Sequence, residues 1–512
     1  MKQAVSALRI ALLFALPLSA AAELRLPHAI SDHAVLQRGG PIHIWGWATP
    51  GALISANFHN QTVPALTDRL GHWNLWLAPE VAGGPYTLTV SGDGPAQTVT
   101  DLLVGDVWLA SGQSNMEIPL DGFGPTTPIK NAAQEIASAN NPKIRLLLTP
   151  KKSSDVPMDD SPATWTTCTP ETARKFSAVA YFFGREIAAR ENVPIGLVDT
   201  TWGGTPADSW LSLDTLGTNP ELLPAFASRA RFADAQADAQ AMIAAEKRED
   251  EEAKAAGKPA PSHFWHPQEN TWLPAALYNG MIAPYTPMSL KGFLWYQGEA
   301  NSAHDRAPYY EALMDGLIGD WRMHFKQGDL PFFYVQLASF TSPGEDWGQV
   351  RDAQRRTLSV ANTAMAVTLD VGQADNVHPP DKQTVAARLA LAARNLVYGE
   401  QVPYSSPLFR EATTELQADG SLAMRVYFNH GEGLTYRGKP ATGFEVAGAD
   451  GKFIAADAKV EHDSVLVSTS GLARPMYVRF GWMGVVENNL YNAAGLPAST
   501  FTSQPPPARF VQ

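Results

Sequence analysis

The feature that most constrains the fold is an alternation of short apolar runs with amphipathic stretches between about residues 101 and 400. Such a rhythm is typical of a parallel sheet wrapped by helices. The predicted strands are 102–109, 195–201, 291–297, 331–337 and 364–370, and the predicted helices are 178–190, 309–325, 347–361 and 382–398. We therefore predict a doubly wound α/β domain, with its ligand outside the carboxyl ends of the strands.

Both flanks of this region are predicted to be β-rich. Residues 23–100 and 401–512 contain short runs in which apolar and polar residues alternate, separated by turn signals. In the first flank these runs lie at 42–47, 54–58, 73–77 and 86–90, and in the second at 422–428, 443–446, 464–468 and 476–480. Short strands at this spacing predict two sandwich-like modules, one on each side of the α/β domain.

The α/β region is interrupted at about 213–261. This stretch is rich in Ala, Glu, Asp, Lys and Arg and ends in a Pro-containing segment. Such a composition favours a solvated helical arm over an acidic binding element.

The first 22 residues have the pattern of a signal peptide. The basic residues Lys2 and Arg9 precede a short apolar run that begins at Ile10 and contains Pro17. Small residues follow at 19–22. The run is shorter than the roughly 20 residues that a membrane span needs. We therefore expect an exported protein, periplasmic or secreted, with no membrane insertion after the signal is removed.

Charge and cysteine content argue against a nucleic-acid-binding protein and exclude a protein stabilised by internal disulfides. The formal net charge of the 512 residues is −12, and loss of Lys2 and Arg9 with the signal peptide would make it −14. This balance argues against a nucleic-acid partner, which requires clustered Lys and Arg. Cys168 is the only cysteine, so no internal disulfide can form, and we interpret it as a small buried hydrophobe.

Ser114 is the candidate nucleophile. It lies in Gly112-Gln-Ser-Asn-Met-Glu117, directly after the first predicted strand of the α/β region. A serine at a strand-to-helix turn has its hydroxyl at the carboxyl edge of the sheet, where backbone N–H groups can stabilise an oxyanion. Met116 stands where the Gly-x-Ser-x-Gly elbow has its second glycine, and on this motif alone a simple helix-capping serine is about equally plausible.

Asp375 and His378 are the candidate partners of that serine. They follow the last predicted strand and precede the helix predicted from residue 382, and Pro379-Pro380 keeps the histidine outside this helix. A serine nucleophile needs a histidine to accept its proton, and this histidine needs a group that fixes its tautomer. Taken alone, either residue could equally be a polar loop residue or a helix cap.

Two further polar motifs end strands of the same sheet. Gly203 and Gly204 lie in Thr200-Thr-Trp-Gly-Gly-Thr-Pro206, where glycines permit a close backbone approach with free N–H groups. Gln297 and Glu299 lie in Phe293-Leu-Trp-Tyr-Gln-Gly-Glu299: Gln297 could donate a side-chain N–H, and Glu299 could be an acid or a buried structural carboxylate. Chance placement of four such motifs at one sheet edge is improbable.

No metal site is predicted. The pair in His263-Phe-Trp-His266 has no third ligand at metal spacing, and the chain has no His-Glu-x-x-His motif. We interpret this segment as an aromatic loop.

Taken in order, the four motifs resemble those of the SGNH hydrolase superfamily and, within it, the sialate O-acetylesterase family of carbohydrate esterases. The matching blocks are Gly112–Met116, Trp202–Pro206, Trp295–Glu299, Leu277–Met281 and Asp375-x-x-His378. Segments at 33–38 and 83–88 and at 489–497 are also similar to the family's two terminal regions. The resemblance thus covers nearly the whole chain after the signal peptide and implies an SGNH-type doubly wound sheet.

The resemblance also implies roles for individual residues. Ser114 would be the nucleophile, His378 the general base and Asp375 its orienting carboxylate. The oxyanion hole would use the N–H of Ser114, the N–H of Gly203 or Gly204, and a side chain that we assign to Gln297. Asn301 is the alternative donor, since the superfamily has an asparagine in this role. No metal or cofactor is implied.

The resulting hypothesis is an exported O-acetylesterase that removes acetyl groups from carbohydrates, either sialic acids or plant hemicelluloses such as xylan or xyloglucan. Trp202, Trp210, Trp295 and Tyr296 could form a sugar platform, although burial in the core is the usual fate of such residues. The alternatives are a non-catalytic glycan-binding protein on the same fold, and an acetyltransferase or short-chain lipase. An acetylated carbohydrate is the expected partner, and the sequence does not determine the oligomeric state.

Overall fold

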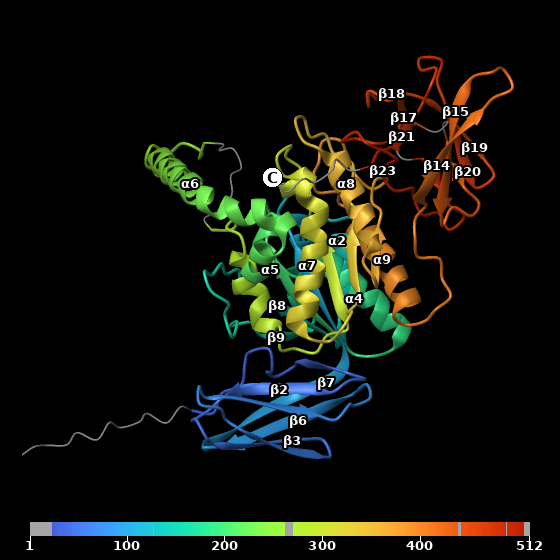
Figure 1. Ribbon diagram of the computed structural model, residues 1–512. Coiled ribbons are helices and arrows are strands. Elements are labelled where there is room, and N and C mark those ends of the chain that lie inside the picture. The colour runs from blue at the N-terminus through green and yellow to red at the C-terminus, as the bar shows by residue number, and fades with distance from the viewer. Residues whose placement is uncertain (1–22, 126, 262–269, 439–441, 488, 506–512) are drawn as a thin grey trace, which may run out of the picture.

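The computed structural model describes residues 23–125, 127–261, 270–438, 442–487 and 489–505. The signal-peptide prediction for residues 1–22 and the aromatic loop His263–His266 lie outside these ranges. The described chain forms a central α/β body with a β domain at each of two ends (Figure 1). The N-terminal β domain lies below the body and the C-terminal β domain lies at its upper side.

The central sheet has the strand order β13-β12-β11-β7-β10-β8-β9. All neighbouring pairs are parallel except β8 with β9. The strands are β7 (Gly94–Gly112), β8 (Asn141–Leu148), β9 (Trp165–Cys168), β10 (Ile195–Thr201), β11 (Gly292–Tyr296), β12 (Phe332–Val335) and β13 (Thr363–Ala366). The five predicted strands of the α/β region are therefore present, and β8 and the edge strand β9 are additions to the prediction.

Helices cover both faces of this sheet. On strand β11, Phe293 and Trp295 pack into one hydrophobic core, and Leu294 and Tyr296 pack into another. The first core includes helix α7 (Tyr310–Phe325) and α8 (Trp347–Arg356), and the second includes α4 (Ala178–Glu191) and α9 (Lys382–Leu396). Every side chain of β11 is buried, as expected for a parallel strand covered on both sides.

Strand β7 lies at the point where the strand order of the sheet reverses. The chain passes from β7 to β8 and β10 on one side and later adds β11, β12 and β13 on the other. Ligands of doubly wound sheets bind at such a switch point, beyond the carboxyl ends of the strands. Ser114 follows β7 at this position.

The same strand also belongs to the N-terminal β domain. Its first half pairs with β6 (Gly83–Gly92) and β1 (Val35–Gln37), and its second half pairs with β10 and β11. The domain is completed by β2 (Ile42–Trp47), β3 (Leu53–Phe58), β4 (Gln61–Leu66) and β5 (His72–Leu77). Strand β7 thus runs continuously across the boundary that the sequence predicts at residue 100.

Two four-stranded antiparallel sheets form most of the C-terminal domain, with the orders β14-β15-β20-β19 and β18-β17-β21-β23. Their inner side chains share one hydrophobic core. The strands are β14 (Leu408–Leu416), β15 (Leu422–Asn429), β17 (Phe444–Ala447), β18 (Ile454–Ala455), β19 (Asp457–Glu461), β20 (Ser464–Ser468), β21 (Tyr477–Phe480) and β23 (Phe501–Thr502), with β16 (Thr435–Tyr436) and β22 (Leu490–Tyr491) paired separately. This arrangement agrees with the predicted sandwich-like module.

Arg351 of α8 joins the α/β body to the C-terminal region. Its side chain is fully buried and donates hydrogen bonds to the carbonyls of Leu337, Ala338, Met483 and Gly484 at 2.7–2.9 Å. Burial lowers the pKa of this guanidinium to about 9. The carbonyl groups, rather than a carboxylate, compensate the buried charge.

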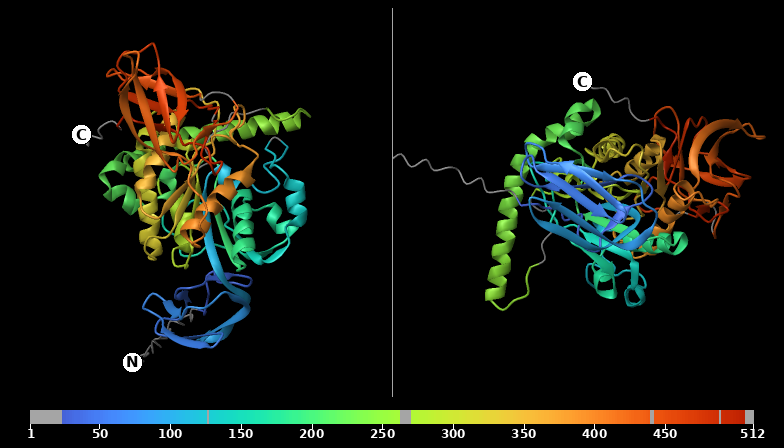
Figure 2. Two further views of the ribbon diagram at one scale, coloured as in Figure 1. Left: turned by 90° about the vertical axis from the view of Figure 1, so that its right-hand side faces the viewer. Right: turned by 90° about the horizontal axis from the view of Figure 1, so that it is seen from below.

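The interruption at 213–261 is helical, as predicted. It contains α5 (Leu213–Thr218) and α6 (Leu223–Ala255), and α6 projects away from the body (Figures 1 and 2). Its described residues from 240 onward are mostly exposed. The remaining short α-helices are α1 (Ser114–Glu117), α2 (Ala132–Ser138) and α3 (Pro170–Arg174), and short 3₁₀ or π-helical turns connect several of the elements. None of the helices in the described ranges is long and apolar enough to cross a bilayer.

Candidate active site

The end of β7 places Ser114 at the upper edge of the sheet. Gly112 has φ +132°, and a Cβ at this position would lie 2.2 Å from the carbonyl oxygen of Tyr296. Only glycine fits this close approach. Gln113 N–H donates to the same Tyr296 carbonyl, and Trp202 N–H donates to the Gly112 carbonyl. The turn before Ser114 is thus held by both neighbouring strands.

Ser114 and His378 are in direct contact. The Ser114 Oγ lies 2.9 Å from the Nε2 of His378, although the two residues are 264 positions apart in the sequence. The loop between β13 and α9 carries the histidine, as the sequence predicts. This geometry lets the imidazole accept the hydroxyl proton.

The imidazole of His378 is held in its neutral form. Burial lowers its pKa to about 4, and the ammonium of Lys382 acts in the same direction. A neutral imidazole at Nε2 is the state that a general base requires. The ring also packs edge-to-face with Phe123, with the two ring centroids 6.2 Å apart.

Asp375 lies in the same loop, three residues before His378, but its side chain is exposed. The hydrogen bonds of the described residues include none between its carboxylate and the histidine. In this loop the Asn376 side chain instead accepts the His378 backbone N–H at 2.9 Å. The role of Asp375 as the orienting carboxylate therefore stays a prediction.

A buried polar network lies directly beside the catalytic pair. The Asn115 side-chain N–H₂ donates to Glu299 at 2.5 Å and to the Val377 carbonyl at 3.0 Å, and its oxygen accepts from Lys382. Burial lowers the pKa of Lys382 to about 7 and raises that of Glu299. Asn115 thus ties the helix of the nucleophile to the loop of the base.

Sequence reasoning missed this network. Asn115 and Glu117 were visible within the nucleophile motif, but nothing in their spacing assigns partners to them. Lys382 opens a helix, where a lysine is ordinarily solvated. Its complete burial follows from the fold and not from a local pattern.

The glycine motif lies next to the nucleophile. A Cβ on Gly203 would come 3.2 Å from the Cβ of Ser114. However, the Gly203 N–H donates to the carboxylate of Glu117, which also accepts from Lys151 at 2.5 Å. Among the hydrogen bonds of the described chain, none uses the N–H of Ser114 or Gly204. The oxyanion hole therefore stays a prediction, with the Ser114 and Gly204 N–H groups at the cavity wall as its candidate donors.

Gln297 does not line the active-site cavity. Its side-chain N–H₂ donates to the Thr205 carbonyl at 3.2 Å and to Asn301 at 2.7 Å, and its oxygen accepts from Tyr310 at 3.0 Å. The alternative, Asn301, is equally engaged, with its N–H₂ donating to Asp208 at 3.0 Å. Both residues are fully buried, so this geometry argues against the predicted third donor. Their hydrogen bonds to the Thr205 carbonyl and the Ala207 N–H stabilise the end of the glycine segment.

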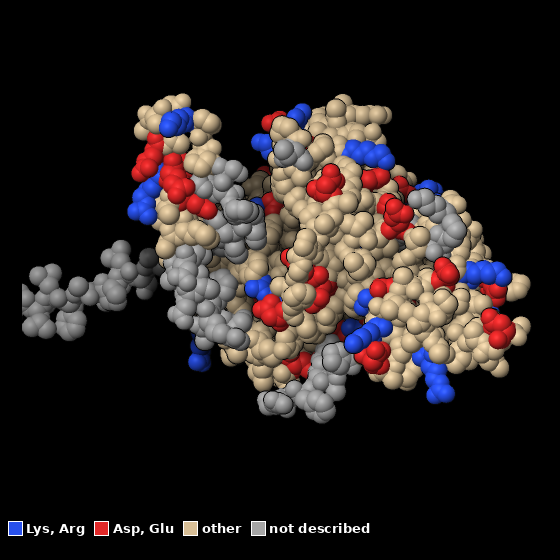
Figure 3. All heavy atoms as spheres, turned by 90° about the horizontal axis from the view of Figure 1, so that it is seen from above, with Lys and Arg blue, Asp and Glu red and all other residues tan. Residues whose placement is uncertain are grey.

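A cavity of about 590 Å³ opens above Ser114 and His378. Its wall includes Trp202, Trp272 and Phe123 together with both acidic and basic side chains. Trp202 is the one member of the predicted aromatic platform in this wall, whereas Trp210, Trp295 and Tyr296 are buried in the cores. Figure 3 views the molecule from this side, and the acidic and basic residues drawn there are scattered between uncharged surface.

Comparison with known proteins identifies the family. Residues 104–245 and 254–395 match the carbohydrate esterase family described as sialic acid-specific acetylesterase. The human sialate O-acetylesterase is 31% identical over 435 residues, covering 76% of this chain and 74% of the human protein. The mouse enzyme is 31% identical, with 80% of each chain covered. This chain belongs to the sialic acid-specific acetylesterase family.

A solved structure of a carbohydrate acetylesterase from Xanthomonas citri is similar over almost the whole molecule. The TM-score is 0.79 and the sequence identity 35%, with 94% of this chain and 100% of that chain covered. Family membership identifies the chain as a carboxylic ester hydrolase of the carbohydrate acetylesterase type. The predicted resemblance is thereby confirmed.

Among the described residues, no group of three or more His, Cys, Asp or Glu side chains is arranged to hold a metal ion.

Cys168 is buried, and burial raises the pKa of its thiol to about 11. The acetylesterase thus carries Cys168 as a core residue, as predicted.

Proposed function

We propose that this acetylesterase acts through Ser114 as nucleophile and His378 as general base. The observation that carries the proposal is the 2.9 Å contact between Ser114 Oγ and His378 Nε2 at the floor of the cavity. A binding protein on the same fold has no need for a neutral histidine hydrogen-bonded to a serine. The acetyltransferase and lipase alternatives share the acyl-enzyme chemistry, but the family assignment favours hydrolysis of carbohydrate acetates.

In the proposed mechanism, Ser114 Oγ attacks the acetyl carbonyl while His378 Nε2 takes the hydroxyl proton. The N–H groups of Ser114 and Gly204 stabilise the oxyanion of the tetrahedral intermediate. His378 then gives the proton to the departing sugar oxygen, which leaves an acetyl-enzyme. A water molecule then attacks the acetyl ester while His378 takes its proton. As the bond between the acyl carbon and Ser114 Oγ breaks, His378 returns this proton to Oγ and acetate leaves.

We further propose that the substrates are acetylated neutral polysaccharides of the hemicellulose type rather than sialic acids. The cavity wall has two cationic side chains, and both are engaged. Lys151 pairs with Glu117, and Arg306 stacks on Trp272 at 4.0 Å and donates to the Ala300 carbonyl.

The acidic residues of the same wall support this choice. Asp305 and Glu345 are exposed carboxylates at the cavity. They would repel the carboxylate of a sialic acid, whereas they can accept hydrogen bonds from the hydroxyls of a neutral sugar.

We also propose export, on the pattern of residues 1–22, with the periplasm and the exterior as the two destinations.

Acetate release tests the proposal. Wild type and Ser114→Ala are compared on 4-nitrophenyl acetate, acetylated xylo-oligosaccharides and O-acetylated sialic acid. We expect Ser114→Ala to lose at least about 10³-fold in kcat/KM, while Ser138→Ala on the exposed helix α2 retains wild-type rates. Equal rates for Ser114→Ala and wild type would reject the serine mechanism. A preference for O-acetylated sialic acid would reject the proposed substrate class.

A further inference from the structure

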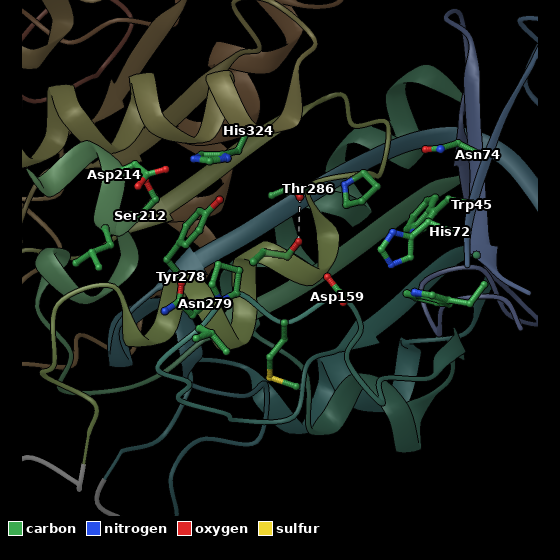
Figure 4. A pocket seen from close by; sticks show the side chains of 18 of the residues that line it. Trp45, His72, Asn74, Asp159, Ser212, Asp214, Tyr278, Asn279, Thr286 and His324 are labelled. Atoms are coloured by element: carbon green, nitrogen blue, oxygen red, sulfur yellow. Dashed lines mark hydrogen bonds between the residues drawn. The ribbon is translucent and has the colours of Figure 1, made fainter. Parts of the chain in front are cut away.

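A second cavity, of about 640 Å³, lies between the N-terminal β domain and the α/β body (Figure 4). It shares no lining residue with the catalytic cavity. Trp45, His72 and Asn74 lie on one side of the view, and Ser212, Asp214, Tyr278 and His324 lie on the other. The catalytic mechanism uses none of these residues.

The β-domain wall is built from two cross-strand pairs. Trp45 of β2 is the register partner of Asn74 of β5, and Trp47 is the partner of His72. All four residues line the cavity. Because successive residues of a strand alternate between its faces, 45 and 47 share a face, as do 72 and 74. Trp45 is 7% exposed and the Arg25 guanidinium stacks on the Trp47 ring at 3.9 Å. The wall therefore presents parts of these indole rings beside polar groups that can hydrogen-bond.

The opposite wall carries a buried hydroxyl. Tyr278, in the π-helical turn η3 (Tyr278–Ile282), is 3% exposed and lines the cavity. Its ring lies 5.2 Å from that of His324. Among the hydrogen bonds of the described residues, none uses the Tyr278 hydroxyl, and burial raises the pKa of this hydroxyl. Buried tyrosine hydroxyls ordinarily have a partner, so this one is available to a ligand.

The charge of the walls restricts what can bind. Four aspartates line the cavity, namely Asp68, Asp155, Asp159 and Asp214, and the described lining contains neither Lys nor Arg. An anionic ligand would be repelled. Carboxylates, the Asn74 N–H₂ group and the Tyr278 hydroxyl suit the hydroxyl groups of a neutral sugar, and the apolar indole surface that remains open beside them suits its C–H groups.

The two walls are fixed to each other. His43 Nδ1 donates to the Pro287 carbonyl at 2.9 Å, and Arg25 pairs with Asp160 at 3.0 Å across the same junction. In addition, Met158 N–H donates to the Asn279 carbonyl at 2.9 Å, which holds the aspartate-bearing loop in place. A cavity with fixed walls loses little conformational entropy when it is filled.

We propose that this interdomain cavity is a second carbohydrate site, which binds a neutral oligosaccharide and anchors polymeric substrate while the catalytic cavity removes acetyl groups. Binding itself does not depend on the proposed esterase function, because the walls of this cavity contain no part of the Ser114–His378 pair. The anchoring role does rest on that function.

Binding is tested by calorimetric titration of the protein with xylohexaose, an unacetylated neutral oligosaccharide. The Trp202→Ala background reduces the contribution of the catalytic cavity. We expect Trp47→Ala to weaken binding more than tenfold and Tyr278→Phe to weaken it about three- to tenfold, the effect of one hydrogen bond. The matched controls, Trp482→Ala and Tyr427→Phe in the C-terminal domain, should bind normally.

Two outcomes would overturn the proposal: unchanged affinity in both Trp47→Ala and Tyr278→Phe, or tighter binding of an anionic hexagalacturonate than of xylohexaose. In the Trp202 wild-type background, Trp47→Ala should raise KM for acetylated xylan several-fold and leave kcat/KM for 4-nitrophenyl acetate within twofold. If the wild type released no acetate while the binding pattern held, the esterase proposal would fail and the second site would stand.

Discussion

At the scale of single residues, the chemistry depends on keeping His378 neutral. Burial is the larger cause of its low pKa, and the Lys382 ammonium is the second. A cation close to a general base is unusual, since it opposes the positive charge that the base acquires during the reaction. The Asn115 oxygen accepts a hydrogen bond from Lys382 and so holds this cation in the buried network beside the base.

The pKa of about 4 for His378 predicts the acidic limb of the pH–rate profile. The imidazole is half neutral at this pH and almost fully neutral, and therefore active as a base, from about one pH unit above it. We expect kcat/KM for 4-nitrophenyl acetate to fall only below about pH 5, and not near 6.5 as for an ordinary histidine. Steady-state rates between pH 3.5 and 7 check this, after confirmation that the protein remains folded throughout. An acidic limb centred near 6.5 would contradict it.

Lys382→Met should move that limb upward. Removal of the ammonium takes away one of the two causes that lower the pKa of His378, so the pKa rises toward 6.5. The NMR titration of the His378 ring in the variant measures the shift directly. Lys130→Met is the matched control, because Lys130 is exposed and pairs with Asp381 at 2.8 Å. An unchanged His378 pKa in Lys382→Met would contradict the assignment.

At the scale of elements, the catalytic pair is assembled from a helix and a loop that meet only at the sheet edge. Asn115 of α1 reaches the Val377 carbonyl, one residue before the base. This contact fixes the loop relative to Ser114. Displacement by even 1 Å can cost on the order of 10²-fold in rate.

Asn115→Ala should therefore lower kcat for 4-nitrophenyl acetate by roughly 10- to 100-fold. The KM should change little, because Asn115 is buried and is absent from the cavity wall. Full kinetic curves separate the two constants. The control Asn140→Ala changes an exposed asparagine and should behave as wild type. A variant with unaltered kcat would show that the loop is positioned by other contacts.

The sequence predicts most accurately the bounds of those helices and strands whose own residues show the apolar pattern of the element along its whole length. Strand β10 has the predicted bounds 195–201, and α4 and α7 differ from prediction by a residue at one end. Strands β8 and β9 were missed because β8 begins with Asn141, Pro142 and Lys143, and because Trp165–Cys168 is short with two central threonines. Such segments become strands only through pairing with neighbours.

In the active site too, some features are predictable from the local sequence and others depend on tertiary packing. Ser114 and His378 could be predicted because each follows a strand, and parallel strands end at one edge. The hydrogen bonds of Gln297 could not, since its partners Thr205 and Tyr310 are set by tertiary packing. A polar residue after a strand can face the cavity or lie beneath it, and the local sequence is the same in both cases.

At the scale of the whole molecule, buried polar contacts join the domains. Arg351→Met should lower the free energy of unfolding by about 3 kcal/mol or more, because several buried carbonyls lose their donor. Chemical denaturation measures this loss. The exposed Arg410→Met should cost less than about 1 kcal/mol. Activity per folded molecule should persist in both variants, and equal stability would contradict the role of Arg351.

Strand β7 has a consequence for how this protein can be divided. It supplies an antiparallel neighbour to β6 at one end and the central parallel strand of the body at the other, and Ser114 follows two residues later. No flexible linker separates the two units along this strand. The N-terminal domain is therefore a poor candidate for deletion or for exchange as an independent module, since a cut within β7 would remove part of the sheet that presents the nucleophile.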